Sequence, residues 1–194
     1  MIFEPKWKSL MANTTSPLFT REQCQDIINM GHQQKSEEAK VGHKEKAGGK
    51  YDTKKRITTI SWIPFKAMPD MYRIIERSMK QVNGNHFGYE GMQLTEVAQF
   101  TEYPKGGFYD WHMDSDVNCQ YEPPVRKISM TILLSPQHEF EGGDLEFLTE
   151  GNKPSQLVQG QAIYFCSLIR HRVAKIKKGR RRSLVMWFGG PPFK

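Results

Sequence analysis

The second half of the chain is a succession of short apolar segments, and this pattern limits the possible folds more than any other feature. From Leu94 onward, runs of five to nine residues rich in Val, Ile, Phe, Tyr and Thr alternate with Gly, Pro and Asn. Such runs are typical of β-strands joined by turns. Strands this short and this numerous predict a double-sheeted jelly roll or a related barrel. The expected strands cover residues 94–102, 109–113, 127–134, 144–148, 161–165, 171–176 and 181–188.

The N-terminal third has a helical pattern instead. Thr20 and Gln23 have the spacing of a capping box, and apolar residues follow on one helical face. A second amphipathic helix is expected from about Pro69 to Val82, because Pro69 suits a first helical turn and a buried stripe follows it. Between the two helices, residues 35–56 are dense in Lys and Glu and have few apolar side chains. We expect a loop there, either a solvated connection or a lid over an active site.

Length and composition fit one globular domain. The chain has 194 residues, of which 38% are hydrophobic and 25% are charged. We therefore expect a single domain over residues 1–194 of mainly β structure with flanking helices (α+β). A helical support would cover about residues 1–90, and a β core about residues 91–194. No run of about 18 apolar residues occurs, so no membrane span is expected.

The cysteines and the N-terminus favour a reducing compartment. Cys24, Cys119 and Cys166 are far apart and odd in number, which does not suit a disulfide framework. They form no CxxC pair, so a zinc site built on thiolates is not expected. The first eleven residues carry Glu4 and Lys6 and lack the apolar stretch of a secretory signal. These features together predict a cytoplasmic protein.

The chain is basic, with a formal net charge of +7. Such a charge suits acidic partners such as nucleic acid, an acidic protein or an anionic small molecule. The same charge could serve solubility alone. Composition does not decide between these interpretations.

A candidate metal site lies in the β region. His112 and Asp114 are two positions apart, and alternation along a strand would turn both side chains to one side. His171, which begins another expected strand, could complete the site from a second strand. Two histidines and one carboxylate on one face of an octahedron leave positions open, as a non-haem Fe(II) oxygenase requires.

Arg181 begins the last expected strand and could bind a carboxylate in the same pocket. We interpret residues 176–179 as a hairpin turn, which would make the strands on either side of it neighbours. Alternation would turn Arg181 inward and Arg180 and Arg182 outward. A fully exposed basic tip that contacts phosphate is the alternative. The hydroxyl of Tyr103 could donate to the carboxylate that Arg181 holds.

Three motifs now resemble one known family. Residues 103–114 match the pattern YxxGxxYxxHxD, residues 141–147 match EGGxxxF, and residues 171–184 match HxVxxVxxGxRxSL with Ile in place of the second Val. Together they resemble prolyl 4-hydroxylase-type Fe(II)/2-oxoglutarate dioxygenases of the bacterial and phage branch. The likeness covers about half of the chain, roughly from Leu94 to Phe188.

The resemblance implies a double-stranded β-helix, also called a jelly roll, that uses Fe(II), 2-oxoglutarate and O2, with ascorbate as the reductant. It implies a peptidyl-proline 4-hydroxylase-like activity on a protein substrate, with release of succinate and CO2. The animal collagen-type enzymes carry Lys at the position of Arg181 and belong to the secretory pathway, so an intracellular protein is the expected substrate. The implied roles are iron binding by His112, Asp114 and His171, binding of the distal carboxylate of 2-oxoglutarate by Arg181 and Tyr103, and peptide contacts by Tyr109, Arg126 and Trp187.

Two alternatives stay open from the sequence. The same iron chemistry could oxidise a nucleobase or another small molecule, with Trp62, Trp111 and Trp187 as a possible stacking platform. A non-catalytic β-sandwich could instead bind nucleic acid through its basic tip, without metal or cosubstrate. Stabilisation by Mn(II) with 2-oxoglutarate separates the binding module from the oxygenases.

Overall fold

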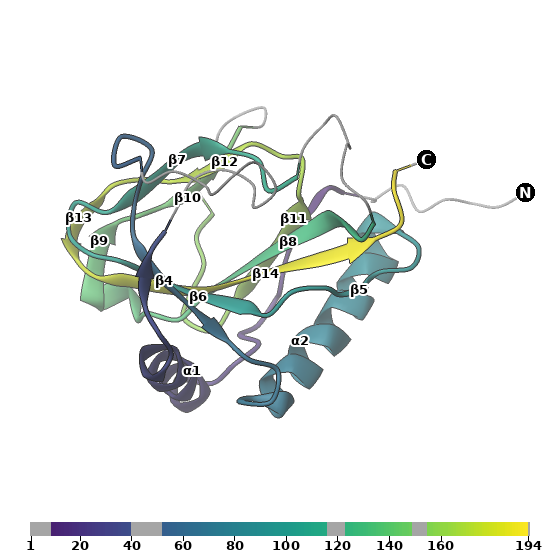
Figure 1. Ribbon diagram of the computed structural model, residues 1–194, viewed down its shortest axis with the longest axis horizontal. Coiled ribbons are helices and arrows are strands. Elements are labelled where there is room, and N and C mark those ends of the chain that lie inside the picture. Colours follow the sequence, from purple (N-terminus) through teal and green to yellow (C-terminus); the bar gives the residue numbers. More distant parts are fainter. Residues whose placement is uncertain (1–8, 40–51, 116–122, 149–154, 194) are drawn as a thin grey trace, which may run out of the picture.

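The chain forms two facing β-sheets and two helices (Figure 1). The structure is a computed structural model, which describes residues 9–39, 52–115, 123–148 and 155–193. The main sheet is antiparallel, with the strand order β1-β11-β8-β14-β6-β4-β2, and β5 pairs with one end of β14 (Figure 1). Its strands are β1 (Met11–Asn13), β2 (Glu37–Glu38), β4 (Thr59–Ile63), β5 (Gln93–Leu94), β6 (Ala98–Tyr103), β8 (Val125–Leu133), β11 (Ala162–Cys166) and β14 (Arg181–Gly190).

A smaller antiparallel sheet lies over one face of the main sheet (Figure 1). Its order is β10 (Leu145–Phe147), β12 (His171–Val173), β7 (Phe108–His112) and β3 (Arg56–Ile57). A separate pair, β13 (Ile176–Gly179) and β9 (Phe140–Gly142), lies at one end of the two sheets (Figure 1). An apolar layer that includes Leu133, Phe147 and Phe165 fills part of the space between the sheets. This arrangement is the predicted double-sheeted jelly roll.

Both helices cover the other face of the main sheet (Figure 1). Helix α1 (Arg21–Gln33) begins with the predicted capping box between Thr20 and Gln23, and α2 (Pro69–Val82) has the predicted bounds. Two short helical turns, η1 (Asn83–Phe87) and η2 (Gln137–Glu139), complete the helical structure of the described residues. Helix residues such as Ile75 pack into one apolar cluster with alternate residues of the sheet, and each fully buried aliphatic side chain contributes roughly 1.5–3 kcal/mol.

Strand β14 shows how this packing positions the site. Its residues Leu184 and Met186 belong to the cluster beneath the helices. Side chains alternate along a strand, so Arg181 and Ser183 are turned toward the smaller sheet, where both are buried. The apolar half of the strand thus fixes which of its polar residues point into the space between the sheets.

The hairpin turn predicted at residues 176–179 is wrong. These residues form β13, which pairs with β9, while β12 and β14 lie in different sheets. The expected strand 171–176 is accordingly divided between β12 and β13. Local spacing suggested neighbouring strands, but pairing with β9 satisfies the backbone of this segment instead.

Some predictions fall on residues outside the described ranges. Residues 40–51 of the predicted loop or lid are among them, so its function stays a prediction, although Arg56 at its end forms β3. Cys119 and residues 1–8 also lie outside, whereas Cys24 and Cys166 are buried free thiols. Within the described ranges no helix is long and apolar enough to span a bilayer.

Candidate metal and cosubstrate site

Three potential metal ligands meet at the end of the smaller sheet. His112 is the last residue of β7, His171 is the first of β12, and the two are directly paired across the strands. Asp114 comes from the turn beyond β7, where its backbone N–H donates to the carbonyl of Ser167 at 3.0 Å. The carboxylate oxygens lie 3.6 Å from Nε2 of His112 and 3.5 Å from Nε2 of His171. One ligand atom from each of the three residues lies within 4.8 Å of the other two.

Backbone carbonyls orient both imidazoles. Nδ1 of His112 lies 2.7 Å from the carbonyl oxygen of Asp110, and Nδ1 of His171 lies 2.9 Å from that of Ile169. Since a carbonyl can only accept, these contacts place a proton on each Nδ1. Both Nε2 lone pairs are thereby directed toward the carboxylate of Asp114, as in protein metal sites whose histidines are held by second hydrogen bonds.

The local electrostatics favour the protonation states that bind metal. Burial and the nearby His171 lower the pKa of His112 to about 4. Burial by itself would raise the pKa of Asp114, but the two histidines and a hydrogen bond with Ser129 outweigh it and lower the pKa to about 2. His112 is therefore neutral and Asp114 ionised near neutral pH, which are the forms that coordinate a metal.

Arg181 is a buried cation that forms no ion pair within the described part of the chain, although the charge of Asp144 is near enough to oppose the lowering of its pKa by burial. Its residue is 3% exposed, and it makes one hydrogen bond, from Nη1 to Oγ of Ser183 at 3.1 Å. It pairs across the sheet with Tyr103, whose ring centroid lies 5.8 Å from the guanidinium carbon. Burial lowers the pKa of Arg181 and raises that of Tyr103. A buried guanidinium that no carboxylate of the described residues contacts directly is a ready site for a carboxylate from a ligand.

Gly143 makes room for this guanidinium. Its φ is +72°, a conformation that side chains rarely adopt. A Cβ at this position would lie 2.2 Å from Cδ1 of Ile176 and 3.0 Å from Cδ of Arg181. The second glycine of the EGG motif thus lets the backbone pack closely against the side chains of Ile176 and Arg181.

The predicted alternation of the three arginines holds, but the outward pair is not a free basic tip. Arg180 and Arg182 both form ion pairs with Glu102, and Arg182 also pairs with Glu139 at 3.1 Å. Much of the positive charge at this end of the molecule is therefore neutralised within the protein.

The three predicted substrate residues lie around the metal ligands. Tyr109 stacks on His112 with ring centroids 3.5 Å apart. The guanidinium carbon of Arg126 lies 3.9 Å from the ring centroid of Trp187, and its Nη1 donates to the backbone oxygen of Asp114 at 3.4 Å. The fold therefore brings all eight residues predicted for the site to one region between the sheets.

Two neighbours of these residues, Arg56 and Glu96, were not predicted from the sequence, and Trp62 was predicted only as part of a stacking platform. The guanidinium carbon of Arg56 lies 4.3 Å from the ring centroid of Tyr109, Trp62 lies 6.3 Å from Trp187 between ring centroids, and Glu96 forms an ion pair with Arg126. Alternating apolar residues at 56–63 could have revealed strands β3 and β4, which carry the first two. The predicted stacking platform is only partly assembled, because Trp111 lies instead against Arg172.

Two buried donors in this region have no acceptor within the described chain. They are Nε of Arg56 and Nε1 of Trp187. Buried N–H groups are nearly always hydrogen-bonded in folded proteins. Their presence beside the candidate metal ligands indicates a place where a bound molecule supplies acceptors.

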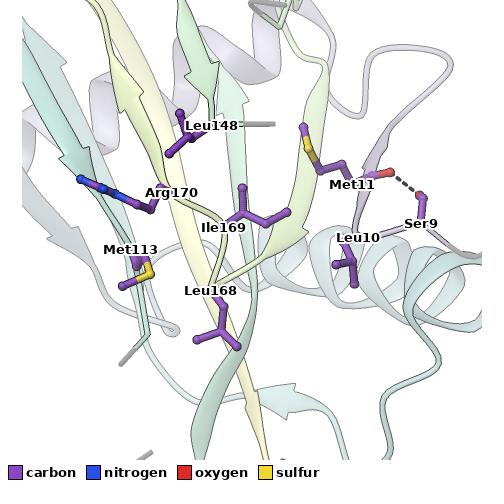
Figure 2. Close-up of a pocket in the computed structure, with 8 residues that line it drawn as sticks. All are labelled: Ser9, Leu10, Met11, Met113, Leu148, Leu168, Ile169 and Arg170. Carbon is purple, nitrogen blue, oxygen red and sulfur yellow. Dashed lines mark hydrogen bonds between the residues drawn. The ribbon is translucent and has the colours of Figure 1, made fainter. Parts of the chain in front are cut away.

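A hollow of about 760 Å³ is lined mainly by apolar residues, some of them next in sequence to the candidate metal ligands (Figure 2). Met113, between His112 and Asp114 in sequence, contributes to its wall, as does Ile169. None of the three metal ligands lines it. The residues around this hollow are Ser9, Leu10, Met11, Met113, Leu148, Leu168, Ile169 and Arg170.

Comparison with solved structures shows the fold of prolyl hydroxylases. The viral collagen prolyl hydroxylase of Paramecium Bursaria Chlorella virus-1 has a TM-score of 0.69 at 16% identity, with 94% of this chain and 97% of that chain covered. A Pseudomonas putida prolyl-4-hydroxylase has a TM-score of 0.65 at 18% identity, with 94% of each chain covered. A Trichoplax adhaerens prolyl hydroxylase in complex with a hypoxia inducible factor peptide fragment has a TM-score of 0.69 at 16% identity, with 93% of this chain and 84% of that chain covered.

Comparison with curated sequences finds PKHD-type hydroxylases. One from Idiomarina loihiensis is 33% identical over 99 residues, which is 50% of this chain and 44% of the relative. Another from Synechococcus sp. (strain CC9902) is 36% identical over 83 residues, which is 42% of this chain and 36% of the relative. The matches thus span less than half of the length of these two relatives. The model of the 2OG-Fe(II) oxygenase superfamily matches residues 98–189, which include all eight residues predicted for the site. The family resemblance of the motifs is confirmed: the chain contains a 2OG-Fe(II) oxygenase domain, and its curated homologues are PKHD-type hydroxylases.

Proposed function

We propose that this protein is an Fe(II)- and 2-oxoglutarate-dependent dioxygenase that hydroxylates proline in a polypeptide substrate. The observation that carries the proposal is the convergence of His112, Asp114 and His171, with both Nε2 atoms directed to one point. Beside it lies Arg181, a buried cation that forms no ion pair with the described residues. A metal and a carboxylate ligand are what these two features require.

The donor set fits Fe(II). Two imidazoles and one carboxylate are the ligands of facial-triad iron sites, which leave coordination positions open. When bound, iron with O2 and 2-oxoglutarate supplies the oxidising power for C–H hydroxylation, with succinate and CO2 as co-products and ascorbate as the reductant that maintains Fe(II). The contribution of His112, Asp114 and His171 is to hold the ion at one end of the space between the sheets.

Arg181 and Tyr103 are proposed to hold the distal carboxylate of 2-oxoglutarate. They are cross-strand partners on β14 and β6, so the sheet fixes their separation. A planar guanidinium can bind a carboxylate through two parallel hydrogen bonds. Because the site is buried, the ion pair is screened less than it would be in water. The cosubstrate is thereby oriented with its other end toward the metal ligands.

Aromatic and orphaned polar groups support a polypeptide substrate. Trp187, Trp62 and Tyr109 offer flat apolar surfaces that suit a compact ring such as that of proline. The buried donors of Trp187 and Arg56 are suited to peptide carbonyl oxygens, and Arg126 is held between Glu96 and the ring of Trp187. One structural neighbour was solved with a bound peptide, and others are named as prolyl hydroxylases, which supports the same substrate class.

A second substrate class is favoured by one observation. The rings of Trp62 and Trp187 lie close enough to border a common space, and a nucleobase could stack there. We therefore retain a nucleobase or another small ring compound as the alternative substrate. For the chain as a whole we propose a single domain and a cytoplasmic location.

Turnover of candidate substrates tests the proposal. Purified protein with Fe(II), ascorbate and 2-oxoglutarate is incubated with proline-rich peptides, and in parallel with short single-stranded oligonucleotides. The expected result is peptide-dependent succinate formation and the addition of one oxygen atom on proline, located by tandem mass spectrometry. Asp114→Ala should lose the activity, whereas Asp110→Asn, on the preceding strand β7 and not a proposed ligand, should keep it. Oxidation of the oligonucleotide alone would support the alternative, and no stabilisation by Mn(II) with 2-oxoglutarate would refute both.

A further inference from the structure

Glu102 is a largely buried carboxylate at the meeting point of four elements. The residue is 8% exposed, and it lies on β6 next to Tyr103. Its carboxylate accepts from Nε of Arg182 at 2.9 Å and from Arg180, and one oxygen lies 3.2 Å from Nε2 of His32 on α1. Arg182 is also paired with Glu139 on η2. No other carboxylate in the described residues has three basic side chains within ion-pair distance.

The place of Glu102 in the sheet relates it to the cosubstrate residues. In the antiparallel register Glu102 is opposite Arg182, and Tyr103 is opposite Arg181. The two arginines that Glu102 binds are therefore the chain neighbours of Arg181 on either side. Alternation turns the Glu102 pairs away from the pocket and the Tyr103–Arg181 pair toward it.

The start of β14 needs such a restraint. The chain leaves β13 at Gly179, whose φ is +70°, and enters the main sheet two residues later at Arg181. Three consecutive arginines repel one another, and Arg181 itself has one hydrogen bond to hold it. An ion-pair clamp on Arg180 and Arg182 fixes this short segment against β6.

We propose that Glu102 is a positioning residue that clamps the two arginines around Arg181 and so presets the 2-oxoglutarate carboxylate site. This inference rests on the proposed binding of 2-oxoglutarate by Arg181 and Tyr103. It gives the first helix a functional connection as well, because His32 joins α1 to the same carboxylate. Burial alone would raise the pKa of Glu102, but its hydrogen bonds with His32, Arg180 and Arg182 lower it, which is consistent with a permanently charged clamp.

Removal of the charge separates positioning from simple electrostatics, because the two effects have opposite signs. Glu102→Gln leaves Arg180 and Arg182 without their shared anion. The potential near Arg181 then becomes more positive, which by itself would tighten the binding of a dianion. Loss of the clamp loosens the start of β14, which would weaken the binding. A weaker affinity therefore identifies the positioning role.

The test measures the dissociation constant of 2-oxoglutarate for the Mn(II)-loaded protein without O2, by calorimetry. For Glu102→Gln we expect an increase of roughly three- to thirtyfold, the range for residues that act on a site through neighbours. The Mn(II) dissociation constant should change less than twofold. Glu102→Asp, which restores the charge, should recover part of the affinity. Glu139→Gln is the matched control, since Glu139 pairs with Arg182 alone, and it should leave the affinity within about twofold.

Further variants make each outcome decisive. An unchanged or smaller dissociation constant in Glu102→Gln overturns the inference, as does an equal loss in Glu139→Gln. If Glu102→Gln does not fold, Arg180→Gln is the second variant, because it removes only the ion pair between Arg180 and Glu102 and Arg180 is half-exposed. It should weaken 2-oxoglutarate binding by a smaller factor. Arg181→Gln tests the underlying site. If it keeps full affinity the proposed function fails, whereas loss in Arg181→Gln without loss in Glu102→Gln refutes the positioning role alone.

Discussion

Arg181→Met should stabilise the ligand-free protein and at the same time abolish 2-oxoglutarate binding. The wild-type residue is 3% exposed and is compensated by one hydrogen bond, to Ser183, and by the charge of Asp144, with which it forms no ion pair. Methionine has a similar length and flexibility but carries no charge, so it can fill the same space. A residue retained for packing should show a loss of stability instead.

The magnitudes follow from the burial. The desolvation of a buried ion costs several kcal/mol, and the hydrogen bond from Arg181 to Ser183 offsets about 1.5–3 kcal/mol of this cost. The net gain in the free energy of unfolding should be about 1–3 kcal/mol, and each kcal/mol shifts Tm by about 2–4 °C in a chain of this size. For the complex, the loss of one partner of a buried ion pair costs about 3–5 kcal/mol, which weakens binding by roughly two to four orders of magnitude.

The assay is thermal unfolding by calorimetry, with Mn(II) alone and with Mn(II) plus 2-oxoglutarate. Arg181→Met should melt higher than the wild type in Mn(II) alone and should gain nothing from 2-oxoglutarate. Arg180→Met is the control. Its side chain is 51% exposed and pairs with Glu102, so it should lose a little stability and retain a response to 2-oxoglutarate. A lower melting temperature for Arg181→Met in Mn(II) alone, or a wild-type response to 2-oxoglutarate, would refute the reasoning.

Three further predictions concern the metal ligands and the pocket wall. The pKa of His112 is about 4 in the folded protein, below its ordinary 6.5, so the unfolded chain binds more protons between pH 6.5 and pH 4. The free energy of unfolding of the metal-free protein should therefore fall by about 3 kcal/mol as the pH drops through this range. Urea denaturation at a series of pH values measures it. Asp114→Ala should lose Mn(II)-dependent stabilisation in thermal melts, and wild-type behaviour would remove it from the site. Gly143→Ala should lower the free energy of unfolding by about 1–3 kcal/mol and weaken 2-oxoglutarate binding, because its Cβ would meet Ile176 and Arg181. An unchanged stability would contradict the close packing at this position.

Motif spacing was sufficient to name the chemistry. The separation of His112 from Asp114 and the position of His171 ahead of a strand-like run selected three residues that the fold brings within 4.8 Å of one another. The alternation around Arg181 was also predictable, because side chains of a strand must face opposite sides. Such short-range rules hold whatever the rest of the chain does.

Pairing between distant strands was not predictable in the same way. The segment after His171 was expected to turn back on itself, but it pairs with β9, and β14 continues into the other sheet. Arg56 was missed, and Trp62 was named only as part of a stacking platform, because both precede the motifs by about forty residues or more. They reach the site only through the pairing of β3 with β7 and of β4 with β6. The energy that selects these pairings comes from burial across the whole domain.

The sequence by itself determined the β-rich architecture, the start of α1, the bounds of α2 and the identity of the candidate ligands, because these depend on periodicity and on the chemistry of side chains. The tertiary structure alone decided that Asp114 reaches the histidines from a turn, that both imidazoles are oriented by backbone carbonyls, and that Glu102 binds the arginines on either side of Arg181. These features depend on angles and distances between segments far apart in the chain, which only the packed sheets define.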